Sequence, residues 1–163
     1  MIRKANEQDS KAIANISVDE WRNTYENIID KTYLENLSIE EKTKKYEEEI
    51  KDTVQYLVCE EEGKIVGYIK YGAIRDEIPP YDSEIYAIYV QKAKQNQEFG
   101  TKLLEAAKEN LRKEGYKRML TWCLEENEIG KRFYEAKKGK KINKRSIPIG
   151  EENYIEVAYG YEL

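Results

Sequence analysis

Histidine is absent from this sequence of 163 residues, and its absence removes several kinds of active site. Ser-His and Cys-His catalysis are excluded, because each needs an imidazole as the general base. A zinc site is also disfavoured, since histidine and clustered cysteines are the usual zinc ligands. We therefore expect no metal, and any general base must be a carboxylate, a tyrosine, a chain terminus or water.

Cysteines and long apolar runs are scarce as well. Cys59 and Cys123 lie far apart within apolar, strand-like runs, with no Cys-x-x-Cys motif, and are expected to be small core residues. No apolar run approaches the roughly 18 residues that a membrane helix needs. The segment Ile2-Arg3-Lys4-Ala5-Asn6 turns polar at once, unlike a signal peptide. We therefore expect a cytoplasmic protein with no membrane partner.

Charge is abundant but nearly balanced. The 28 Lys and Arg residues face 32 Asp and Glu residues, which gives a formal net charge of −4. Nucleic acid as the main partner would require a basic face, so this balance argues against it and leaves cationic amines open as substrates. The length and the lack of a linker predict one domain over residues 1–163.

Local signals predict strands and helices in an order that suits a mixed sheet. Asn6 with Asp9, and Ser38 with Glu41, have the spacing of helix capping boxes. Asn127 can cap a further short helix, and Gly115 is expected to end a helix in the left-handed conformation. Pro79-Pro80 cannot continue a strand. We expect a strand at 2–5, a helix to near residue 30, a helix at 38–50, a hairpin of strands at 54–60 and 64–74, a loop at 75–81, a strand at 85–90, a helix from 100 to 115, a strand at 118–124, a short helix after 127 and a final strand at 154–163.

The stretch from Glu84 to Leu104 joins a strand to a helix through a polar loop, and this arrangement predicts an anion site. The loop reads Gln95-Asn96-Gln97-Glu98-Phe99, and Gly100 then opens a helix with apolar residues at every fourth position. The first amides of such a helix have no intrahelical acceptor, and the helix dipole favours negative charge there. Phosphate or pyrophosphate is the natural ligand, although neither the P-loop nor the dinucleotide-binding glycine pattern is present.

This loop resembles the Gln/Arg-x-x-Gly-x-Gly/Ala signature of the GNAT superfamily of acetyl-CoA-dependent N-acetyltransferases. Gln95 and Gly100 fit the signature, whereas Glu98 stands where its first glycine is expected. Two alternatives are open: the Glu98 carboxylate is favourably placed at a helix N-terminus, or it repels the pyrophosphate. Three lysines lie close enough in sequence to offset its charge: Lys92, Lys94 and Lys102.

A second segment, from Asn127 to Glu135, resembles the Asn-x-x-Ala-x-x-Phe-Tyr-Glu hallmark of the same family, with Gly130 in place of alanine. Together the two hallmarks extend the resemblance over essentially the whole chain. It implies an α/β (α+β) fold of three layers, with a mixed, mostly antiparallel sheet whose central parallel strands splay apart to admit acetyl-CoA as co-substrate. Asn127 would meet the pantetheine arm, and a main-chain amide near Val90 would meet the oxyanion. The residues expected to bind acetyl-CoA are Ile88, Tyr89, Val90, Gln95, Asn96, Gln97, Glu98, Phe99, Gly100, Thr101 and Asn127.

Tyr134 and Glu84 are the candidate catalytic residues. By the resemblance, Tyr134 approaches the thioester sulfur, and it can donate a proton there because tyrosine is protonated at neutral pH. The alternative is a core tyrosine beside Phe133. Glu84 is the candidate base, collecting the proton of the attacking amine through water. Its alternative is a charge at a strand edge, and Asp82 is the fallback base.

Trp21 and Tyr25 are the candidate walls of the acceptor pocket. They lie in a Trp-Arg-x-x-Tyr segment that resembles the first helical region of many small bacterial GNAT proteins. The alternative is a pair of core anchors one helical turn apart.

The resemblance implies an enzyme that transfers an acetyl group from acetyl-CoA to a primary amine by direct attack in a ternary complex. We expect a small-molecule acceptor, such as a polyamine, an aminoglycoside-like amine or an amino acid. A protein N-terminus or a lysine side chain is the alternative acceptor, and a non-catalytic acyl-CoA-binding module is the alternative class. Many members of the family are dimers, so a homodimer is open.

Overall fold

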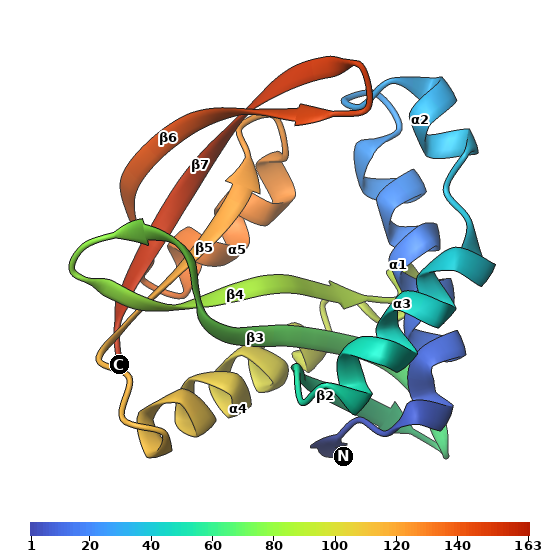
Figure 1. Cartoon of the computed structure of the whole chain (residues 1–163), viewed down its shortest axis with the longest axis horizontal. Helices are drawn as coiled ribbons and strands as arrows, with labels where there is room; N and C mark the ends of the chain where they lie inside the picture. Colours follow the sequence, from blue (N-terminus) through green and yellow to red (C-terminus); the bar gives the residue numbers. More distant parts are fainter.

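One sheet of seven strands forms the centre of the structure, a computed structural model that describes residues 1–163. The strand order is β1-β2-β3-β4-β5-β7-β6, and every neighbouring pair is antiparallel except β4 with β5 (Figure 1). The predicted fold class, a mixed and mostly antiparallel sheet, is thereby confirmed. The strands are β1 (Ile2–Lys4), β2 (Gln55–Glu61), β3 (Lys64–Ile78), β4 (Tyr81–Val90), β5 (Arg118–Leu124), β6 (Lys140–Ile149) and β7 (Glu152–Glu162).

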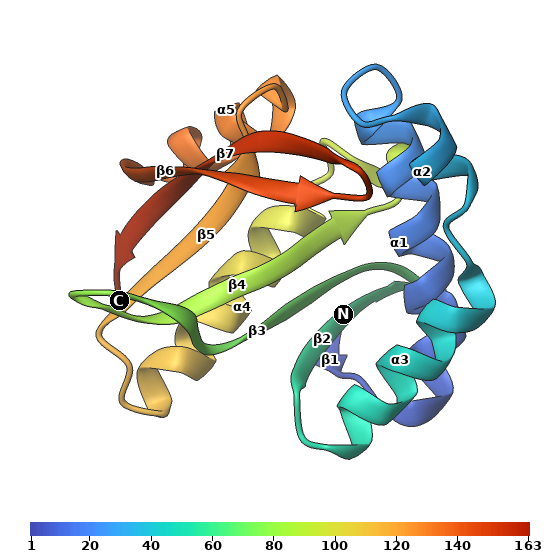
Figure 2. The same cartoon turned by 45° about the horizontal axis from the view of Figure 1, so that its top comes forward.

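The first group of helices covers one face of the sheet (Figures 1 and 2). α1 (Ser10–Tyr25) follows the short turn η1 (Glu7–Asp9), and α2 (Lys31–Glu35) and α3 (Ile39–Lys51) come next. The residues through which α1 and α3 meet β2 and β3 form one apolar cluster, including Ile13, Ala14, Tyr46, Tyr56 and Tyr68.

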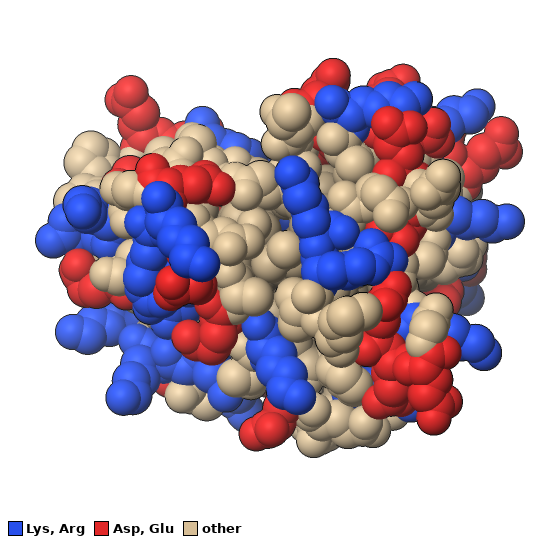
Figure 3. All heavy atoms as spheres, turned by 90° about the horizontal axis from the view of Figure 1, so that it is seen from below, with Lys and Arg blue, Asp and Glu red and all other residues tan.

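The second group covers the opposite face, where the larger core lies. α4 (Phe99–Lys113) packs Leu103, Leu104 and Leu111 beneath the strands, and α5 (Glu128–Ala136) adds Tyr134 to the same cluster. The outer side of α4 is turned toward the viewer in Figure 3, where positive and negative side chains are interspersed. None of the helices is both long and apolar enough to cross a membrane.

β4 and β5 form the predicted parallel pair, joined by the crossover helix α4. They pair only between Ser83–Ile85 and Met119–Thr121. Beyond those residues, Ala87–Val90 pairs on one side with β3, and Trp122–Leu124 pairs on one side with β7. Tyr86 is an extra residue in the β3–β4 register, and such a bulge bends its strand. We call the end at which the two strands separate the open end of the pair.

The capping signals were largely correct. The Asn6 amide donates to Asp9 Oδ2 at 2.8 Å in the predicted capping box, and Ser38 Oγ accepts from the Glu41 amide at 3.1 Å. Asn127 Oδ1 accepts from the Gly130 amide at 3.0 Å and begins α5. Gly115 ends the α4 region with a φ of 96°, the left-handed conformation that glycine adopts without steric cost.

The predicted loop at 75–81 was wrong. β3 continues to Ile78 and β4 begins at Tyr81, so only Pro79-Pro80 remains as a turn. The extended ends of β3 and β4 are held together by contacts between the two strands. The Arg75 amide donates to Glu84 Oε1 at 3.1 Å, and the Tyr86 hydroxyl donates to the Ala73 carbonyl. The short helix α2 was also missed. Asp30 caps it by accepting from the Tyr33 amide at 3.2 Å.

Arg3 ties the beginning of the chain to β2. Its guanidinium donates to both oxygens of Asp9, at 2.8 and 2.9 Å, and to Glu60 Oε1 at 2.7 Å. The hydrogen bonds from Arg3 are the main cause that lowers the pKa of Asp9, followed by the Asn6 amide, against the opposing effect of burial.

Asp9→Asn should lower the free energy of unfolding at pH 7 by about 1.5–3 kcal/mol, the range for hydrogen bonds to charged groups. Because the folded pKa of Asp9 lies below its unfolded value, its contribution is complete above the unfolded pKa and is lost as pH falls through the folded pKa. The loss of stability between pH 7 and pH 3 should therefore be smaller in Asp9→Asn. Urea unfolding at both pH values measures this, and equal losses in both proteins would contradict it.

Candidate functional site

The loop between β4 and α4 presents a row of free main-chain amides. After β4, the chain passes through η2 (Lys92–Lys94) and reaches α4 at Phe99. Asn96 and Glu98 have φ angles of 65° and 66°, so left-handed residues alternate with others in the loop. None of the amides from Asn96 to Thr101 donates a hydrogen bond within the protein. A row of unsatisfied amides at a helix N-terminus is chemically suited to donate hydrogen bonds to a phosphate-type anion.

Glu98 adopts the backbone conformation that the glycine of the signature would supply. Its φ of 66° is left-handed, and its exposed side chain makes no capping hydrogen bond. The departure from the signature therefore changes the side chain and its charge, whereas the left-handed turn that glycine favours is preserved.

A buried glutamate that the sequence analysis missed holds this loop against α1. Glu20, only 3% exposed, accepts from the Lys92 amide at 3.2 Å and from Gln95 Nε2 at 3.0 Å. Gln95 Nε2 also donates to the Val90 carbonyl at 3.1 Å, so the side chain of the signature glutamine connects the loop to α1 and to the end of β4. Burial raises the pKa of Glu20, while hydrogen bonds from Asn23 and the Lys92 amide oppose that rise. The only sequence signal was an acidic residue on the apolar stripe of α1.

Four of the predicted site residues meet at the open end of the parallel pair. The Tyr25 hydroxyl from α1 lies 3.4 Å from the Tyr89 hydroxyl of β4. Burial raises the pKa of Tyr25 to about 12, opposed by Tyr89 and by the Asn127 side chain. Burial also raises the pKa of Tyr134 well above its ordinary value, with a further rise from Cys123. All these hydroxyls are therefore protonated at neutral pH and available as hydrogen-bond donors.

Gly130 is required where the hallmark has alanine. A Cβ atom at this position would lie 2.6 Å from Asn127 Nδ2 and 2.9 Å from Cys123 Sγ. The Cys123 thiol and the Asn127 amide therefore occupy the space that an alanine methyl group would need.

Glu84, the predicted base, lies away from the tyrosines at the open end. Glu84 is 2% exposed and pairs with Leu120 at the closed end of β4 and β5. Its two oxygens accept from the Arg75 amide and from Arg75 Nε, each at 3.1 Å. Tyr89 is five residues further along the strand, about 16 Å at the usual rise. The fallback Asp82 accepts from the amides of Lys117 and Arg118, each at 3.0 Å.

Trp21 also lies beside, rather than within, the group of site residues at the open end. Its ring meets Tyr25 edge-on at 5.0 Å and Tyr33 at 6.2 Å, and Lys42 Nζ lies 5.6 Å from its centre. Trp21 therefore packs against Tyr25 from one helical turn earlier in α1.

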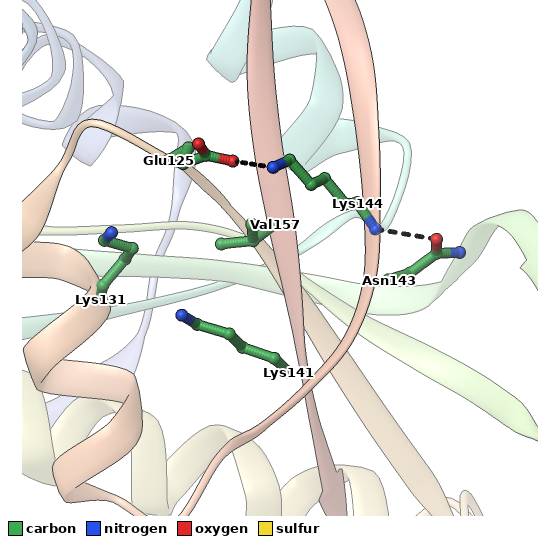
Figure 4. A pocket seen from close by; sticks show the side chains of 6 residues that line it. All are labelled: Glu125, Lys131, Lys141, Asn143, Lys144 and Val157. Carbon is green, nitrogen blue, oxygen red and sulfur yellow. Dashed lines mark hydrogen bonds and ion pairs between the residues drawn. The ribbon is translucent and has the colours of Figure 1, made fainter.

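A cavity between α5 and β6 contains none of the predicted site residues. It has a volume of about 520 Å³ (Figure 4). Lysines dominate its wall, but Lys144 pairs with Glu125 at 2.7 Å and Lys131 with Glu128 at 2.9 Å. Its lining consists of Glu125, Lys131, Lys141, Asn143, Lys144 and Val157.

The structure has the separating parallel strand pair that the two sequence hallmarks implied, and a loop of free main-chain amides lies beside it. Residues 15–139 match the sequence model of the Acetyltransferase (GNAT) family, and the chain belongs to that family. It is therefore an acyl-CoA-dependent N-acetyltransferase. The chain is 33% identical over 160 residues to the protein described as uncharacterized N-acetyltransferase YuaI of Bacillus subtilis (strain 168), covering 98% of this chain and 91% of that one.

Solved structures share the fold over the full length. A ribosomal-protein-alanine N-acetyltransferase from Brucella melitensis has a TM-score of 0.78 at 23% identity, covering 100% of this chain and 99% of that one. The paia N-acetyltransferase from Thermoplasma acidophilum, in complex with coenzyme A, has a TM-score of 0.76 at 20% identity, covering 99% and 98%.

Glu98→Gly should stabilise the fold by about 1 kcal/mol, because glycine adopts a positive φ without the Cβ clash. Glu62→Gly is the matched control, since Glu62 also has a positive φ of 52° but lies in the β2–β3 turn. Only Glu98→Gly should also tighten acetyl-CoA binding, by about fivefold at low salt, through loss of a negative charge at the anion loop. The gain should shrink at 1 M salt.

Urea unfolding and calorimetric titration at two salt concentrations measure these effects for both variants. Weaker binding of acetyl-CoA by Glu98→Gly would overturn both alternatives for this residue and would assign its side chain an ordering role in the loop.

Glu20→Gln should weaken acetyl-CoA binding by about fivefold without lowering stability. A glutamine can offer an acceptor to only one of the two loop donors, and one lost hydrogen bond costs about 1 kcal/mol. Because the folded pKa of Glu20 is raised, its ionised form costs stability at neutral pH, and the neutral amide removes that cost. Asn23→Ala, which removes a 3.3 Å contact to Glu20 but none to the loop, is the control. Equal acetyl-CoA affinities in calorimetry would contradict the loop role.

Proposed function

We propose that this protein transfers the acetyl group of acetyl-CoA to a primary amine of a small molecule, by direct attack in a ternary complex. The observation that carries the proposal is the meeting of two features at the open end of β4 and β5. One is the row of free amides from Asn96 to Thr101, and the other is the group of hydroxyls from Tyr25, Tyr89 and Tyr134, of which Tyr25 and Tyr134 are buried and Tyr89 is half-buried.

The free amides suit the pyrophosphate of acetyl-CoA, with Gly100 letting it approach the helix start. The pantetheine arm would lie between the separated strands, along Ile88–Val90 on one side and near Asn127 on the other. There the strand amides of β4 that no longer face β5 are suited to stabilise an oxyanion. These roles support acetyl-CoA as the bound acyl donor.

In the reaction, the amine nitrogen bonds to the thioester carbon, the carbon–sulfur bond breaks, and the thiolate leaves with the electron pair. The Tyr134 hydroxyl would donate a hydrogen bond to that sulfur. Its raised pKa makes complete proton transfer to a thiolate costly, so we assign it stabilisation of the leaving group. We assign the amine proton to water, since Glu84 and Asp82 are engaged with Arg75 and with main-chain amides.

A closed frame around the acceptor side favours a small acceptor. The turn between β6 and β7 reaches α2, where the Tyr154 hydroxyl accepts from the Asp30 amide at 2.8 Å (Figures 1 and 2). At the same contact, Gly150 lies against the Tyr33 ring. A folded protein would have to insert its chain past this contact. The Brucella structure is named as a ribosomal-protein-alanine acetyltransferase, and a protein N-terminus is therefore the second candidate acceptor.

The test is release of free CoA thiol from acetyl-CoA across a panel of polyamines, amino sugars, amino acids and N-terminal peptides. We expect turnover with at least one small amine and none with the peptides. Tyr134→Phe should slow turnover by about tenfold to hundredfold without abolishing it, because a thiolate can leave unaided.

Gly100→Asp is the control, since it places charge and bulk where the pyrophosphate must approach, and it should abolish both turnover and stabilisation by acetyl-CoA. Turnover with peptides alone would replace the small-molecule proposal by the protein acceptor. An absence of both turnover and acetyl-CoA-dependent thermal stabilisation would refute the catalytic proposal.

A further inference from the structure

Glu156 on β7 is a buried carboxylate with one free oxygen. It is 7% exposed, and its Oε1 accepts from Arg145 Nε at 2.6 Å. No group in the protein donates a hydrogen bond to its Oε2, in contrast to Glu84, whose two oxygens are both engaged. Oε2 is also not among the fully enclosed polar atoms that lack a partner, so it borders accessible space.

The position of Glu156 is the open end of the parallel pair. In the sheet register it lies opposite Leu124, the last residue of β5. Leu124 belongs to the same apolar cluster as Tyr25. The Glu156 charge contributes to the raised pKa values of both Tyr25 and Cys123, which places it close to each.

Strand alternation puts Glu156 on the acceptor side of the sheet. The next residue, Val157, belongs to the core cluster beneath α4, so the Glu156 side chain points to the opposite face, where α1 lies. Trp122 of β5 faces the same way, because Arg145 lies over its ring at 3.9 Å. The Glu156 carboxylate and the Trp122 ring therefore face the side of the sheet from which α1 brings Tyr25.

The local charge is negative. Arg145 also donates to Asp76 at 2.8 Å, so one guanidinium serves two carboxylates. Stacking on Trp122 fixes this guanidinium and thereby the oxygen that it binds. One negative charge is left over among these three groups. Asp76 is largely exposed, whereas the buried Glu156 carboxylate attracts a cation more strongly than it would in water.

We propose that the free oxygen of Glu156 binds the ammonium group of the acceptor, with Trp122 and Tyr25 flanking its carbon chain. This inference rests on the proposed function, because it names the acceptor class as primary alkylammonium compounds. Acceptors with a carboxylate next to the amine are disfavoured by Glu156 and Asp76. The alternative is an ion pair that serves only to fix β6 on β7.

Binding is tested directly, without turnover, by calorimetric titration of the CoA-saturated protein. The probes are spermidine, tyramine and glucosamine, together with tyrosol, in which a hydroxyl replaces the ammonium of tyramine. At least one amine should bind, and tyramine should bind more tightly than tyrosol. Glu156→Gln should weaken amine binding by about tenfold or more, as expected for loss of a charge-assisted hydrogen bond, and leave acetyl-CoA affinity within twofold.

Glu60→Gln is the matched control, since Glu60 is a partly buried carboxylate bound by Arg3 on the distant strand β2. It should leave amine binding unchanged, and Glu156→Asp, which keeps the charge, should lose less affinity than Glu156→Gln. Equal amine affinity in Glu156→Gln, equal binding of tyramine and tyrosol, or no binding of any amine would overturn the proposal.

If Glu156→Gln does not fold, Glu156→Asp and the comparison of tyramine with tyrosol decide the question. Amine binding that depends on Glu156, without any release of CoA, would refute the proposed function while leaving this ammonium site standing.

Discussion

The structure depends on the short pairing of β4 with β5. Had the two parallel strands stayed hydrogen-bonded along their length, the sheet would be continuous and no path would lead from one face to the other. They separate after Ile85 and Thr121, and the polar edges beyond that point need other partners. Side chains from α1 and α5 fill part of the gap, which is why Tyr25 and Tyr134 arrive there from opposite faces. The separation thus creates the site and determines which elements can supply its residues.

The loop from Gln95 to Thr101 gives up local stability in order to present free main-chain amides. Two non-glycine residues with positive φ and a row of unsatisfied amides are costly on their own. The cost is tolerated because the loop is fastened from beneath by Glu20 and Gln95. The helix that carries Tyr25 is therefore the same helix that holds this loop, so the two halves of the proposed site share one support.

The features that were predicted correctly from the sequence depend on local signals. The caps at Asn6 and Asn127, the glycine at position 115 and the crossover helix depend on residues within a few positions of each other, and the structure agrees with them. The strand segment at 75–78 was wrongly predicted as a loop. Pro79-Pro80 determines only the turn itself, whereas contacts to Glu84 and Ala73 allow the two strands to extend. Glu20 and Glu156 could not be predicted as site residues. Their significance comes from partners on other elements, and no spacing along the chain reports such contacts.

The absence of histidine acquires a further meaning beside the buried hydroxyls. At the open end, burial holds the pKa values of Tyr25 and Cys123 near 12 and that of Tyr134 well above its ordinary value. None of these groups changes its charge between mild acid and mild base. Apart from the carboxylates, the fraction of acceptor amine that is unprotonated is then the quantity at the site that changes most as pH rises. The curve of rate against pH would consequently shift with the basicity of whichever amine is being acetylated.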